Sequence, residues 1–112
     1  MINYNNKIFK PVSVSSNGEV SEEVLFHYHQ EGDILNCTYK GGQIKYGHLI
    51  GKVNKNGGID IRYHQINSMN ELLTGTCHSV PKINKDGKIL LSETWQWTSG
   101  DKSKGTSVLI EI

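Results

Sequence analysis

Alanine is absent from this chain of 112 residues, so its composition lacks the strongest helix-forming residue. Apolar side chains nowhere recur at the 3.6-residue period of an amphipathic helix. No stretch approaches the roughly 20 apolar residues of a membrane-spanning helix. The N-terminus also lacks the apolar segment of a signal peptide. We therefore expect a cytoplasmic all-β protein that does not enter a membrane.

An excess of charge of either sign is also missing. Twelve basic side chains face eleven acidic ones, and the net charge is +1. The lysines are scattered and form no basic run among the aromatic residues, which argues against nucleic-acid binding. Cysteine is scarce as well, because only Cys37 and Cys77 occur and neither belongs to a C-x-x-C motif. We expect two reduced thiols on strands, with a disulfide as the alternative.

Glycine, by contrast, is abundant and occurs with asparagine and aspartate at short intervals. Such pairs supply the positive φ angles of tight hairpin turns. The turns divide the chain into eight expected strands: Lys7–Val14, Glu22–Glu31, Asp33–Lys40, Gln43–Asn54, Gly58–Asn67, Glu71–Val80, Lys88–Thr98 and Thr106–Ile112. Pro11 predicts an edge position or a bulge in the first strand, and Gly47, Gly51 and Gly75 predict bends or bulges in later ones.

Eight short strands joined by tight turns predict an antiparallel up-and-down meander that forms one domain over residues 1–112. An open sheet would leave two unpaired edges, whereas closure removes them. Eight strands enclose an interior just wide enough for side chains or one small ligand. We therefore expect a small closed β-barrel, with a two-sheet sandwich as the alternative.

The segment E-T-W-Q-W-T-S-G-D, Glu93–Asp101, contains both tryptophans of the chain. Because side chains alternate along a strand, Glu93, Trp95 and Trp97 share one face. A carboxyl group beside two indoles has its pKa raised by desolvation unless a cation reaches it, and it can then act as a general acid or base. Arg62 is the expected cation if a bulge shifts its strand. The alternative is a carboxylate at the rim with no special role.

Strand parity predicts which side chains face inward. The expected inward sets are Val24, Phe26 and Tyr28; Ile44, Tyr46, His48 and Ile50; Ile59, Ile61, Tyr63 and Gln65; Ile89, Leu91, Glu93, Trp95 and Trp97; and Val108, Ile110 and Ile112. One end of this interior is aliphatic and the other is aromatic and polar, as in small-molecule sites. The predicted ligand-binding residues are Tyr28, His48, Tyr63, Gln65, Glu93, Trp95 and Trp97. The alternative is a filled core whose polar groups satisfy one another.

The remaining motifs do not predict a metal site, a phosphate site or a catalytic nucleophile. His27 and His29 have a spacing that can chelate zinc, but parity turns them away from the tryptophan face, so we predict no metal and no cofactor. The segment Thr98–Gly105 lacks the lysine and the following helix of a phosphate loop, and we expect a flexible connection able to cover one barrel end. No nucleophile pattern identifies catalytic residues. Apolar residues out of phase with the inward set, such as Leu25 and Leu49, predict a covered outer face and hence a homodimer.

Three segments carry a resemblance to a known family: Y-K-G-G-Q-I-K-Y-G-H-L-I-G at Tyr39–Gly51, I-R-Y-H-Q-I-N at Ile61–Asn67, and E-T-W-Q-W-T-S-G-D-K-S-K-G at Glu93–Gly105. They resemble a family of small bacterial proteins of undetermined activity, over nearly the whole chain. Its members are often labelled N-acetylglutamate synthase automatically. The resemblance implies a compact β-barrel in the broad manner of lipocalin and avidin relatives.

The label implies an N-acetyltransferase, which is the enzyme alternative for this chain. An enzyme that holds acetyl-CoA needs a loop that binds the pyrophosphate and leads into a helix N-terminus, and the sequence predicts neither. We therefore expect a non-enzymatic barrel that binds a small, partly apolar molecule near Trp95 and Trp97. An enzyme that uses Glu93 and a filled, self-associating barrel remain the alternatives.

Overall fold

The computed structural model describes residues 2–112, and these form nine β-strands and no helix. No helix long and apolar enough to cross a membrane is therefore found in this range. The strands are β1 (Ile8–Val14), β2 (Phe26–His27), β3 (His29–Glu31), β4 (Ile34–Gly41), β5 (Ile44–Val53), β6 (Ile59–Asn67), β7 (Leu72–Ile83), β8 (Ile89–Trp97) and β9 (Lys104–Glu111). The predicted all-β class is confirmed.

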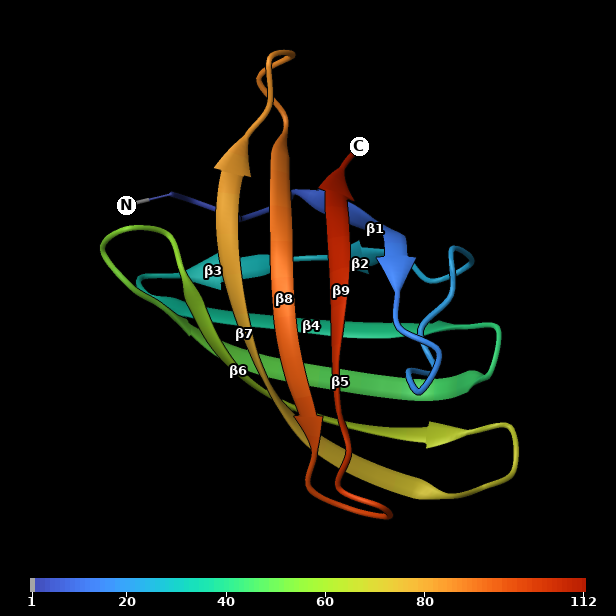
Figure 1. Cartoon of the computed structure of the whole chain (residues 1–112). Coiled ribbons are helices and arrows are strands. Elements are labelled where there is room, and N and C mark those ends of the chain that lie inside the picture. The colour runs from blue at the N-terminus through green and yellow to red at the C-terminus, as the bar shows by residue number, and fades with distance from the viewer. Residues whose placement is uncertain (1) are drawn as a thin grey trace.

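All nine strands belong to one antiparallel sheet in the order β2-β1-β9-β8-β7-β6-β5-β4-β3. The sheet curls so that β7, β8 and β9 cross in front of β4, β5 and β6 (Figure 1). Its two edge strands, β2 and β3, are separated in the chain by Tyr28 alone. Tyr28 bridges to the N-terminal segment, because its amide donates to Lys7 O at 2.9 Å and its carbonyl accepts from the Asn6 amide at 2.9 Å. The meander thus closes into a nearly complete barrel, as predicted.

The ninth strand arises because one predicted strand is divided. The run expected at Glu22–Glu31 begins only at Phe26 and breaks at Tyr28, so that β2 pairs with β1 and β3 pairs with β4. One continuous segment therefore serves both edges of the barrel. The bulge predicted at Pro11 is confirmed, since the register of β1 against β9 shifts between Pro11 and Ser13.

The predicted inward faces are confirmed for β2, β6 and β8 but are wrong for most of β5. A bulge between Ile44 and Tyr46 shifts the register of β5 against β6 and reverses the parity after Ile44. Tyr46 is consequently 71% exposed, and Ile50 also faces outward, while Leu49 is buried. Apolar residues occur on both faces of this strand, so the alternation of side chains could not reveal the shift in register.

The inward face of β9 was also predicted wrongly. Ser107 and Leu109 are buried, whereas Ile112 lies outside the strand and is 52% exposed. Leu109 pairs directly with Leu91 of β8, and directly paired residues point to the same face of a sheet. Pairing with the inward residues of β8 therefore sets the orientation of β9.

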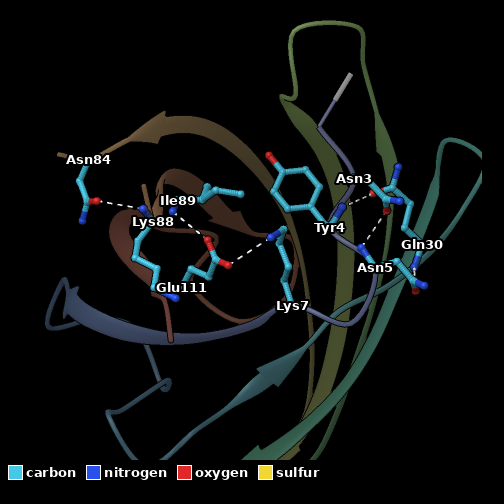
Figure 2. A network of polar contacts seen from close by, with 9 residues as sticks. All are labelled: Asn3, Tyr4, Asn5, Lys7, Gln30, Asn84, Lys88, Ile89 and Glu111. Atoms are coloured by element: carbon cyan, nitrogen blue, oxygen red, sulfur yellow. Dashed lines mark hydrogen bonds and ion pairs between the residues drawn. The ribbon is translucent and has the colours of Figure 1, made fainter. Parts of the chain in front are cut away.

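One end of the barrel is closed by the N-terminal segment, whose Tyr4 side chain packs against Phe9 and Tyr28; we call this cluster the Tyr4 plug. The Tyr4 ring is fully buried and lies 6.1 Å from the rings of Phe9 and Tyr28, measured between centroids. Its hydroxyl donates to Gly57 O at 2.6 Å. Figure 2 shows the surrounding network, in which the Glu111 carboxylate accepts from Lys7 Nζ at 3.1 Å and from the Ile89 amide at 3.0 Å. These contacts fix the N-terminal segment across this end.

Both cysteines are free and buried, on β4 and β7 respectively. This confirms the prediction of reduced thiols on strands. Burial raises the pKa of the Cys37 thiol to about 12 and that of Cys77 still further. Both thiols therefore stay protonated at neutral pH and behave as small apolar core groups.

Candidate functional site

A cavity lies inside the barrel at the end opposite the Tyr4 plug. Its volume is about 70 Å³, which is room for a few water molecules or a small organic group. Six aromatic side chains line it: Phe26, Tyr28, Tyr39, Tyr63, Trp95 and Trp97. The interior is thus neither completely filled nor open through its length.

Three of these rings face the cavity because the residue directly paired with each is a glycine. Tyr39 pairs with Gly47, Tyr63 with Gly75, and Trp95 with Gly105. In all three cases a methyl group added to the glycine would overlap the paired ring. The ring therefore lies flat over the neighbouring strand, where any other residue would displace it. Gly47 and Gly75 were predicted only as bends or bulges, and Gly105 was placed in the flexible connection. Their role in making room for the aromatic rings was missed.

Glu93 supplies the carboxylate of the cavity from the middle of β8. It lies in a row with Ser79 of β7 and Ser107 of β9, which are its direct partners in the two adjacent strands. Ser79 Oγ donates to Glu93 Oε2 at 2.6 Å, and Ser107 Oγ donates to Glu93 Oε1 at 3.0 Å. No residue in 2–112 forms an ion pair with Glu93, and Arg62 instead contacts Asp60 on the exposed outer face at 2.8 Å. The predicted pairing of Arg62 with Glu93 is wrong.

The protonation of this region follows from burial. Desolvation raises the pKa of Glu93, and the hydrogen bonds from Ser79 and Ser107 oppose the shift without reversing it. Desolvation also raises the pKa of Tyr28 and of Cys77, and the nearby Glu93 charge adds to both shifts. Glu93 therefore gives up its proton at a higher pH than an exposed glutamate does, while Tyr28 and Cys77 stay protonated.

Tyr28 places an unused polar group beside the cavity. The residue is fully buried, and its hydroxyl has no hydrogen-bond partner among residues 2–112. Leaving a buried hydroxyl unpaired costs about 1–3 kcal/mol. An unpaired group of this kind in a cavity wall is explained when a ligand or a water molecule supplies the missing bond.

A loop between β1 and β2, residues 15–25, covers the cavity, and we call it the cover loop. Its residues Gly18, Glu19 and Val20 line the cavity. The Glu19 carboxylate accepts from Gln65 Nε2 at 2.9 Å and from Asn67 Nδ2 at 2.8 Å, which ties the loop to β6. Tyr39 in turn donates its hydroxyl to Gln65 Oε1 at 2.8 Å. A polar chain thus joins the loop to the aromatic wall.

The segment predicted to cover the barrel does not reach the cavity. No residue between Thr98 and Gly105 lines it. This segment instead supports the cover loop, because Asn17 Nδ2 donates to Ser103 Oγ at 3.0 Å and to Lys104 O at 2.8 Å. The Trp97 indole N–H also donates to Asn17 O at 3.1 Å. Sequence patterns do not reveal that residues 15–25 cover the cavity, because the hydrogen bonds of Asn17 and Glu19 in this loop join residues between 46 and 87 positions apart.

Six of the seven predicted site residues line the cavity: Tyr28, Tyr63, Gln65, Glu93, Trp95 and Trp97. His48 does not, because the β5 bulge turns it to the outer face, where its ring lies 5.2 Å from that of His64. His27 and His29 also lie on the outside of the barrel, as predicted, with their rings 4.7 Å apart. The residues missed from the sequence are Tyr39, Glu19 and the two serines that bind Glu93.

Comparison with known proteins agrees with this architecture. Neither a curated protein nor a solved structure matches the chain. The sequence model of the avidin-like proteins, however, matches residues 2–112. A nearly closed antiparallel meander with a cavity at one end is consistent with that match and with the avidin relationship that the sequence resemblance implied. The chain belongs to the avidin-like protein family.

Proposed function

We propose that the protein binds a small, partly apolar molecule in the cavity at the Trp95 and Trp97 end of the barrel. The observation that carries the proposal is the buried Tyr28 hydroxyl, which lacks a partner within residues 2–112 and lies in the wall of an aromatic cavity. The rings provide apolar area, while Tyr28, Gln65 and Glu93 supply polar contacts that would orient the ligand. The match to the avidin-like family supports binding rather than catalysis.

The size of the cavity limits the ligand. With a volume of about 70 Å³, the cavity accommodates only a small organic group. A longer ligand has to displace the cover loop or extend past it toward solvent. The small cavity therefore favours metabolites with few non-hydrogen atoms, or larger ones of which only one end is buried.

Tryptophan fluorescence tests this proposal directly, because the only two tryptophans of the chain both line the cavity. We expect members of a broad panel of small metabolites to shift the emission and to raise the thermal unfolding temperature. Tyr28→Phe should weaken such binding about fivefold to a hundredfold through loss of one hydrogen bond, whereas Tyr46→Phe on the exposed face should not. A panel that changes neither the emission nor the unfolding temperature would contradict the proposal.

An acetyltransferase is the enzyme alternative that the label on similar proteins raises. The residues that line the cavity come from strands and from the cover loop, so no helix N-terminus is positioned to hold a pyrophosphate. We expect acetyl-CoA and glutamate to yield no product with the purified protein. Product that is lost in Glu93→Gln, with the fold retained, would establish the enzyme instead.

We also propose that the protein self-associates through its outer face. Leu25, Tyr46 and Leu72 are at least half exposed and line one groove on this face together with the His48 and His64 rings. Exposed apolar area of this kind is typical of an interface between subunits. Light scattering should give a dimer mass, and Tyr46→Glu should shift it toward the monomer.

A further inference from the structure

The charge of the cavity wall is one-sided. Glu93 and Glu19 contribute carboxyl groups to it, and no lysine, arginine or histidine within residues 2–112 lines it. Neither glutamate forms an ion pair within this range. Ionisation of either carboxyl group therefore gives the wall negative charge without an internal counter-charge, although the chain as a whole is close to neutral.

Glu93 retains unused hydrogen-bonding capacity. An ionised carboxylate has about four acceptor sites, and Ser79 and Ser107 fill one on each oxygen. The unpartnered Tyr28 hydroxyl belongs to the same wall and can also accept a hydrogen bond. The two groups together give the cavity wall free acceptor sites, and the Tyr28 hydroxyl also keeps a proton that it can donate.

The aromatic rings add a second attraction for positive charge. The Trp97 ring lies edge to face with Tyr63, at 5.6 Å and 71°, and with Trp95, at 5.7 Å and 65°. Rings inclined in this way present faces in different directions around the cavity. The face of an aromatic ring carries partial negative charge and attracts cations, most strongly when water is excluded.

We infer that the cavity takes a small organic cation with N–H donors, a protonated amine or an amidinium, in preference to a neutral or anionic molecule. This inference rests on the proposed function, because it names the ligand class of the same site. The cationic head donates to Glu93 and Tyr28, and the apolar body of the ligand lies against Trp95 and Trp97. An anion would meet an uncompensated carboxylate in a poorly hydrated space.

Binding of a cation is coupled to a proton. Glu93 accepts the ligand in its ionised form, and desolvation raises the pKa of Glu93 in the free protein. The cation affinity therefore rises as the pH rises through that pKa. The groups around Glu93 are Ser79 and Cys77 on β7, Ser107 on β9 and the Tyr28 hydroxyl, and its charge also acts on Tyr39 of β4 and Tyr63 of β6. Desolvation raises the pKa of Cys77 and of all three tyrosines, which keeps these groups neutral. Glu19 is the other carboxyl group of the cavity.

Isosteric pairs that differ in charge provide the test. Acetamidinium and acetamide form one pair, and benzamidinium and benzamide form a larger one. Titration calorimetry and tryptophan fluorescence at pH 7 should show the cation of at least one pair binding about tenfold or more tightly than its neutral partner. The preference should disappear in Glu93→Gln. Binding of the cation should strengthen as the pH is raised and Glu93 loses its proton, while binding of the neutral partner should not.

The outcomes separate the two levels of the proposal. Neutral members that bind as well as the cations, with affinity lost in Tyr28→Phe, would overturn the cation inference and leave the binding function in place. If neither pair nor the wider metabolite panel changes the tryptophan emission, the cation inference and the proposed binding function are both wrong. Should Glu93→Gln fail to fold, as shown by circular dichroism, the pH dependence in the unmodified protein decides. Equal pH response of cation and neutral partner then overturns the inference.

Discussion

At the scale of single residues, two glutamates of the barrel show how a partner decides the role of a carboxyl group. Burial acts to raise the pKa of Glu111, but the Ile89 amide and Lys7 outweigh it, so the pKa is lowered and the group stays ionised. Glu93 receives hydrogen bonds from the Ser79 and Ser107 hydroxyls and from the Cys77 thiol, but desolvation outweighs them and its pKa is raised. Glu111 is thus held in a structural ion pair, whereas Glu93 keeps an uncompensated carboxyl group beside the cavity.

The opposite directions of these two pKa changes predict opposite effects of pH on stability. A raised pKa contributes stability that is present below the unfolded-state value of about 4.3 and is lost as pH rises through the folded-state value. The unmodified protein should therefore lose stability through Glu93 as the pH rises above about 4.3. Glu93→Gln, which has no proton to lose there, should not show this decrease. The free energy of unfolding, measured with urea from pH 4 to 8, should rise for the variant relative to the unmodified protein.

Glu111→Gln provides the matched control at the other barrel end. A lowered pKa contributes stability that is present above the unfolded-state value and is lost as pH falls through the folded-state value. This variant should therefore be destabilised at pH 7 and approach the unmodified protein at low pH. Parallel pH profiles for Glu93→Gln and Glu111→Gln would contradict the assignment of the two environments.

At the scale of strands and loops, the sequence predicted what is local and missed what depends on register. Turn residues located the strands, and the alternation on β6 and β8 placed Tyr63, Gln65, Glu93 and both tryptophans in the interior correctly. On β5 apolar residues occupy both faces, so the bulge between Ile44 and Tyr46 left no trace in the pattern and His48 was placed wrongly. Gly47, Gly75 and Gly105 make room for the aromatic rings of the residues paired with them. This role depends on strand pairing, which the alternation of side chains alone does not predict.

The cover loop is expected to control entry to the cavity through Glu19. Glu19→Ala removes the acceptor for Gln65 and Asn67, two hydrogen bonds to a charged group worth about 1.5–3 kcal/mol each. Amides of residues 15–25 should then exchange with deuterium about tenfold faster or more, as measured by mass spectrometry. Glu22→Ala, an exposed position in the same loop, is the control and should leave exchange unchanged. Equal exchange in the two variants would show that Glu19 does not hold the loop.

At the scale of the whole molecule, closure of the barrel depends on two features that the sequence did not predict. The strand break at Tyr28 lets one segment pair with both β1 and β4, which brings the two edges of the sheet together. The N-terminal segment then crosses one end with Tyr4 buried against Phe9 and Tyr28. Both features join residues distant in sequence, and neither has a periodic pattern. The plug at one end leaves the tryptophan end as the site of the cavity.

Tyr4 is therefore expected to stabilise the barrel through both its ring and its hydroxyl. Tyr4→Phe leaves the ring but removes the donor to Gly57 O, a buried bond of 2.6 Å across 53 residues, and should cost about 1–3 kcal/mol of unfolding free energy. Tyr4→Ala also removes the ring and should cost about 3–5 kcal/mol. Tyr46→Phe, at a 71% exposed position, should change stability by less than about 0.5 kcal/mol. Urea denaturation measures all three, and a Tyr4→Ala cost no larger than that of Tyr46→Phe would show that the N-terminal segment does not close the barrel.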